Sequence, residues 1–61
     1  LSDNQYKAAL QQGIDILKLL IKKYDKAIEL DYEASIMNFL IENHLRLKAE
    51  KEELEMLKEQ Y

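Results

Sequence analysis

The sequence predicts an all-α fold: an antiparallel hairpin of two long helices that completes a four-helix bundle or coiled coil by oligomerisation. Apolar residues recur at spacings of three and four over most of the chain, which is the period of a helix. The 61 residues include one glycine, Gly13, and no proline, so no strong helix breaker is present. A chain this short buries little surface and, without cysteine, has no disulfide, so a partner chain is the expected source of stability.

The first helix is predicted over about residues 3–30. Ser2 is a good N-cap, and Gln5, three residues on, can return a hydrogen bond to it as a capping box. Leu1 and Tyr6 stand where a hydrophobic staple needs them. The helix has one apolar face that is wider than the seam of a two-chain coiled coil, so we expect it to have more than one neighbour. This face consists of Tyr6, Ala9, Leu10, Gly13, Ile14, Leu17, Leu20, Ile21, Tyr24, Ala27 and Ile28.

The second helix is predicted over about residues 32–60. A heptad-like line of residues, spaced alternately four and three, runs along it. Apolar neighbours widen this line only before residue 48, because the segment 48–53 is almost entirely polar. The apolar face therefore narrows toward the C-terminus. The line consists of Ile36, Leu40, Asn43, Leu47, Glu50, Leu54, Leu57 and Tyr61.

The joint between the helices is predicted near residue 31. Asp31 can act as the N-cap of the second helix, and Glu33 would favour the positive end of that helix's dipole. One continuous helix and three shorter helices are the alternatives. A continuous helix of roughly 90 Å would have to cover its apolar faces entirely with other chains, whereas a hairpin covers much of them internally. Burial therefore favours the hairpin.

A hairpin centred on Asp31 brings residue i level with about residue 62 − i. Leu17 is then predicted opposite Leu45, and Ile21 opposite Ile41. Gly13 comes level with Ala49, and two small residues would let the helix backbones approach closely. The alternative for Gly13 is a harmless place in a loosely packed turn.

Composition and charge narrow the class of protein. The net charge is −3, with +1 over residues 1–30 and −4 over residues 31–61, which favours pairing of the two halves with each other or with the other half of a second copy. No apolar run approaches the roughly 18 residues of a membrane span, so no membrane partner is expected. The lack of cysteine fits a cytoplasmic protein. Because the chain starts at Leu1 and ends at Tyr61 within a helical pattern, we expect a processed chain or a fragment.

No residue pattern predicts catalysis, a metal or a cofactor. His44 is the most catalysis-like residue, but Leu40, Ile41, Leu47 and Lys48 occupy the positions where further ligands would stand. We interpret it as a core or flanking histidine; a metal site shared by His44 from two copies is the alternative. The chain has no serine–histidine–acid arrangement and no glycine-rich phosphate loop, so it is not predicted to be an enzyme.

Asn43 has two possible roles. It falls on the heptad-like line, where a buried asparagine can specify register and oligomeric state. The alternative is a place at the edge of the seam, in contact with water.

A basic stripe on the first helix raises the question of nucleic acid. Acidic residues lie in the same sector and cancel much of its field, so nucleic-acid binding is disfavoured.

A hairpin of about sixty residues with Glu29-Leu30-Asp31 at its turn, dimerising into a four-helix bundle, resembles the Rop-type RNA-binding proteins in architecture. Rop-like layers alternate small and large residues, whereas this chain has large residues at most such positions. The basic stripe through which such a dimer would bind nucleic acid lies on the first helix and consists of Lys7, Lys18, Lys22 and Lys26.

We therefore predict a protein–protein interaction or oligomerisation module that works as a homodimer, a homotetramer or a helical partner's binding site. A small regulator that binds and inhibits or titrates another protein is the first alternative, with Ile16 and Leu19 as its exposed patch. A Rop-like dimer that binds nucleic acid through the lysine stripe is the second. The predicted oligomer or partner interface comprises Leu10, Gly13, Ile14, Leu17, Leu20, Ile21, Tyr24, Ile36, Leu40, Ile41, Leu47, Leu54 and Leu57.

Overall fold

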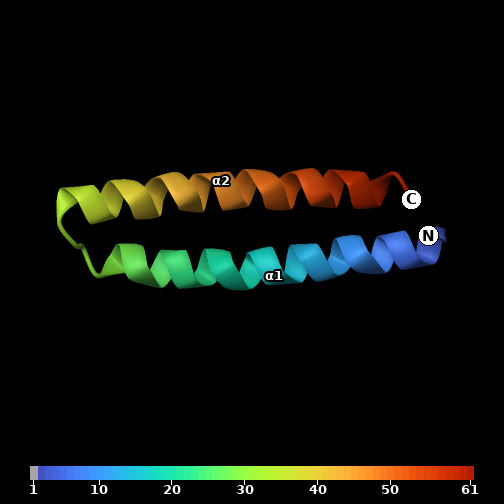
Figure 1. The fold of residues 1–61 in the computed structure, drawn as a ribbon, viewed down its shortest axis with the longest axis horizontal. Coiled ribbons are helices and arrows are strands. Elements are labelled where there is room, and N and C mark those ends of the chain that lie inside the picture. The colour runs from blue at the N-terminus through green and yellow to red at the C-terminus, as the bar shows by residue number, and fades with distance from the viewer. Residues whose placement is uncertain (1) are drawn as a thin grey trace.

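Two long helices form an antiparallel hairpin in the computed structural model, which describes residues 2–61 (Figure 1). Helix α1 spans Asp3–Glu29 and helix α2 spans Ala34–Glu59. Both chain ends lie at one end of a rod that measures 47 × 15 × 14 Å, and the loop lies at the other (Figure 1). The predicted hairpin is confirmed, and the alternatives of one continuous helix and of three shorter helices are wrong.

The start of α1 has the predicted capping box. The Ser2 hydroxyl accepts a hydrogen bond from the Gln5 backbone N–H at 3.2 Å, and Gln5 Oε1 accepts one from the Ser2 N–H at 3.0 Å. These two bonds satisfy backbone donors that a helix N-terminus leaves unpaired. The predicted staple involves Leu1, which lies outside the described residues. Tyr6 packs its ring edge-on against Tyr61, with the ring centroids 4.9 Å apart.

The turn corrects the role predicted for Asp31. This residue follows the C-cap Leu30 and has a φ of 54°, in the left-handed region that commonly ends helices. Its N–H donates to the Ile28 carbonyl at 3.2 Å, so it ends α1 and does not cap α2. Glu33 is the N-cap of α2 and makes no side-chain capping bond. Aspartate suits both positions, because its short polar side chain caps helices and also tolerates left-handed backbone.

The core is a single thin seam between the helices. Leu10, Ile14 and Leu47 are its buried side chains, with 7%, 2% and 8% of their surfaces exposed. On α2 the residues turned toward α1 follow the spacing of three and four along a line slightly different from the predicted one. That line passes through Met37, Leu40, His44, Leu47, Lys51, Leu54 and Lys58, all of them buried or half-buried.

The register across the seam differs from the prediction. Tyr6 meets Tyr61 and Gly13 lies under Leu54, so the numbers of paired residues add up to 67 rather than 62. Two causes shift the register. The first turn of α2 projects beyond the last turn of α1 (Figure 1), and side chains of both helices lean toward their own N-termini.

The shift alters which side chains face the seam. Leu45 is 62% exposed and Ile41 42% exposed, so neither occupies the place predicted opposite Leu17 and Ile21. Ala49 does not pair with Gly13; a leucine side chain fills that place instead.

Within residues 2–61, neither helix combines the length and the apolar character needed to cross a membrane.

Candidate interaction surface

The two helices leave two long faces between them, and one of these is polar. Lys58 Nζ donates a hydrogen bond across the seam to Gln11 Oε1. A hollow of about 330 Å³ opens on this side, lined mostly by charged and amide side chains. The lining residues are Lys7, Gln11, Ile14, Lys18, Glu55, Lys58 and Glu59.

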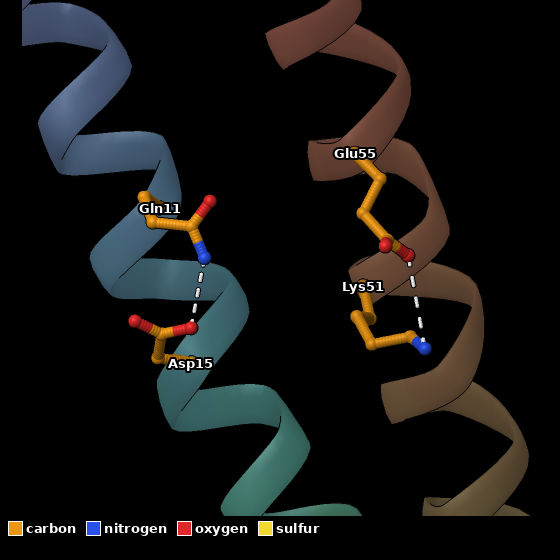
Figure 2. A network of polar contacts seen from close by, with 4 residues as sticks. All are labelled: Gln11, Asp15, Lys51 and Glu55. Carbon is orange, nitrogen blue, oxygen red and sulfur yellow. Dashed lines mark hydrogen bonds and ion pairs between the residues drawn. The ribbon is translucent and has the colours of Figure 1, made fainter.

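Side-chain bonds within each helix hold part of this polar face in place. Figure 2 shows Gln11 Nε2 donating to Asp15 Oδ1 at 2.8 Å on α1, and Lys51 Nζ 3.7 Å from Glu55 Oε1 on α2. Gln11 therefore joins a carboxylate of its own helix to the Lys58 ammonium of the other. Gln11, Asp15, Lys51, Glu55 and Lys58 therefore have polar partners within the hairpin.

His44 lies on the same side and faces α1. Its side chain is 13% exposed, and its Nε2 lies 2.6 Å from Oδ1 of Asp25, which is 57% exposed. Nε2 is buried and has no hydrogen-bond partner, so its polar contact is this close approach to the Asp25 carboxylate. Within the part of the chain that the structure describes, no three His, Cys, Asp or Glu residues gather closely enough to hold a metal ion. The sequence interpretation of His44 as a core or flanking residue agrees with this position.

The predicted lysine stripe also borders the polar face. Lys7 and Lys18 line the hollow together with Glu55 and Glu59 of α2, while Lys22 and Lys26 are exposed. Carboxylates from the facing helix therefore add to those of α1 in opposing the positive field of the stripe. A phosphate backbone, which binds by neutralisation of its charge, is poorly matched by such a surface.

The opposite side of the hairpin is apolar in the half that contains the loop. At 100° per residue, Leu20 projects about 160° away from Lys18, and Phe39 about 160° away from Glu55. Because Lys18 and Glu55 line the polar hollow, Leu20 and Phe39 lie on the other side of the hairpin. This side has its own shallow hollow of about 190 Å³, lined by Lys23, Tyr24, Ala27 and Leu40.

Exposed apolar side chains lie on the same side of the hairpin as this hollow. Ile16 and Leu20 of α1 are 57% and 37% exposed, and Ile36 and Phe39 of α2 are 41% and 59% exposed. On each helix these residues are three or four positions apart, so they stack on one side. We call this surface the apolar face, and define it by Ile16, Leu20, Tyr24, Ala27, Ile36 and Phe39.

Exposed apolar side chains are concentrated in the half of the rod that contains the loop. Among the described residues, nine of the eleven large exposed hydrophobic side chains lie between residues 16 and 45. The other two are Met56 and Tyr61, in the open half that contains the chain ends. Leu19, which the sequence places in a possible partner patch with Ile16, is 62% exposed.

The residues predicted to form the interface fall into three groups. Leu10, Ile14 and Leu47 are buried within the hairpin, and Leu20, Ile36 and Ile41 are exposed. The remaining ones are half-buried: Gly13, Leu17, Ile21, Tyr24, Leu40, Leu54 and Leu57.

The predicted interface leaves out Ile16, Ala27 and Phe39 of the apolar face, and of these Phe39 is the large side chain on α2. It follows Ile36 by three positions, and this helical spacing was the signal in the sequence that could have found it. Asn43, beside it, is occupied within its own helix. Its Nδ2 donates to the Phe39 carbonyl at 2.8 Å, and its Oδ1 accepts from Arg46 Nη2 at 2.6 Å.

Comparisons of the chain with protein-family models, with curated proteins and with solved structures gave no match.

Proposed function

We propose that this chain is a non-catalytic self-association module, in which two hairpins pack face to face and complete a four-helix bundle. The observation that supports this most directly is the apolar face, where large side chains remain exposed beside a thin core. Exposed apolar side chains gathered on one face are typical of protein–protein contacts.

Surface area supports the same proposal. The hairpin exposes 4834 Å². A compact monomer of 7.3 kDa is expected to expose about 4,200 Å². The elongated hairpin therefore exposes about 650 Å² more than a compact monomer of its mass, and this surface is available for a partner to cover.

Sedimentation equilibrium with far-UV circular dichroism, over a wide range of protein concentration, tests the proposal. We expect a species with twice the 7.3 kDa mass of the chain, and helicity that falls as dilution separates the copies. A helical monomer at every concentration would contradict self-association.

A regulator that binds another protein is the second candidate, because a face-to-face dimer leaves other apolar side chains uncovered. Leu19 and Leu45 are each 62% exposed and project away from the apolar face. If these side chains serve a partner, the assembled dimer should bind a hydrophobic dye, and Leu19→Lys with Leu45→Lys should abolish that binding without changing the dimer mass. Equal dye binding by the double variant would contradict this candidate.

A further inference from the structure

We infer that a second copy of this chain docks on the apolar face with the loop ends of the two hairpins together. This inference rests on the self-association through the apolar face proposed above and adds to it the orientation of the two copies. Three features bear on it: the possible orientations of two hairpins packed face to face, the distribution of apolar side chains along the rod, and the charges of the two helices.

Two-fold symmetry allows two orientations of hairpins that share one face. If the axis runs parallel to the helices, the loops lie at the same end, and α1 of each copy lies beside α2 of the other. If the axis runs across the helices, the loops lie at opposite ends, and α1 lies beside α1 and α2 beside α2.

The distribution of apolar side chains favours the loops-together orientation. The exposed large side chains of the apolar face, Ile16, Leu20, Ile36 and Phe39, all lie in the loop half of the rod. If the loops lie together, the apolar loop halves of the two copies cover each other, and Leu20 and Phe39 are buried between them. If the loops lie apart and the two rods overlap over their full length, each apolar loop half faces the open half of the other copy. In that half α2 is rich in glutamate and lysine. That contact would bury charged groups without matched partners, which is costly.

The charges of the helices favour the same orientation. Helix α1 has five lysines against four acidic residues, a net charge of +1. Helix α2 has six glutamates against four basic residues, a net charge of −2. If the loops lie together, α1 of each copy lies beside α2 of the other, and these neighbours have net charges of opposite sign. If the loops lie apart, the two negatively charged α2 helices lie side by side and repel each other.

Distances between spin labels test the orientation, because the chain has no cysteine of its own. Tyr32→Cys places a label in the loop, and Asn4→Cys places one in the first turn of α1, both at exposed positions. Loops together, each pair of identical labels should be about 30 Å apart or less, since neighbouring helices lie about 8–10 Å apart.

Other results would overturn the inference. Pairs separated by about the 47 Å length of the rod at both positions would place the loops apart. Close loop labels combined with Asn4 labels farther apart than the rod is long would indicate a staggered antiparallel dimer. In both cases the protein is still a dimer, so only the orientation fails. A monomer at all concentrations would instead overturn the proposed function.

A pair of variants tests the face. Phe39→Glu puts a charge in the apolar face and should weaken dimerisation about 100-fold or more. Met56→Glu is the matched control, because Met56 is 65% exposed on α2 but projects about 100° away from Phe39, on the side remote from α1. Its dimer dissociation constant should stay within about threefold of the original, since isolated surface substitutions have small effects. Equal dissociation constants for the two variants would exclude the apolar face as the docking site.

Discussion

Asp31 adopts a backbone conformation that costs an L-residue free energy. Its φ of 54° lies in the left-handed region, where a Cβ crowds the following carbonyl oxygen, and glycine avoids this crowding. We expect Asp31→Gly to raise the free energy of unfolding by about 0.5–1 kcal/mol, measured by urea titration at a fixed protein concentration. Asn38→Gly, at an exposed helical position of α2, should lower it by about 0.3–0.5 kcal/mol. Destabilisation by both changes would contradict strain at Asp31.

Gly13 is the second residue at which backbone and packing compete. A Cβ placed there would lie 3.0 Å from Cδ1 of Leu54, at the far end of a half-buried side chain that can move. We expect Gly13→Ala to stabilise the protein by less than the roughly 1 kcal/mol that alanine gains over glycine in a helix. With Leu54→Ala as the background, the full gain should appear in urea unfolding. Equal effects of Gly13→Ala in both backgrounds would exclude the contact.

For single residues, the sequence predicts which positions have a structural role better than it predicts what that role is. Gly13 and Asp31 both stand out in the sequence, as the single glycine and as the acidic residue at the turn. Their neighbours depend on the register, which no local pattern specifies. Gly13 therefore faces Leu54 instead of Ala49.

At the scale of elements, the two helices start differently. Helix α1 has a complete capping box from Ser2, whereas α2 starts at Glu33 without a side-chain cap. We expect Ser2→Ala to lower the free energy of unfolding by about 1 kcal/mol. Ser35→Ala is the matched control: its hydroxyl donates only to Glu33 Oε1 at the exposed start of α2, so the effect should be within about 0.5 kcal/mol. The check is thermal unfolding followed by circular dichroism, and similar losses for both variants would be the contrary result.

The extents of the helices were predictable because their signals are local. The first helix is predicted over residues 3–30 and spans Asp3–Glu29 in the structure. The second is predicted over residues 32–60 and spans Ala34–Glu59. The start of the second helix was wrong by two residues because Asp31 suits two roles. The line of α2 residues that faces α1 was only partly predictable. Leu40, Leu47 and Leu54 were predicted correctly. His44, Lys51 and Lys58 were missed because their side chains are polar, although they are half-buried at the seam.

At the scale of the whole molecule, the hairpin divides into an apolar face and a polar face. On the polar face, Gln11 forms hydrogen bonds within the chain with Asp15 and Lys58. The apolar face has no such partners, and it exposes Phe39 and Ile16 by more than half. The sequence predicted a need for more than one neighbour from the width of the first helix's apolar face. It did not predict which side remains open, because that depends on how the two helices meet.

Urea unfolding at two protein concentrations a hundredfold apart is the most direct test of self-association. If two copies fold and associate together, the higher concentration adds about 2.7 kcal/mol to the stability of the dimer, and the midpoint should move up by about 1 M urea. An identical midpoint at both concentrations would mean that the hairpin is stable alone, and would contradict its assembly into a bundle.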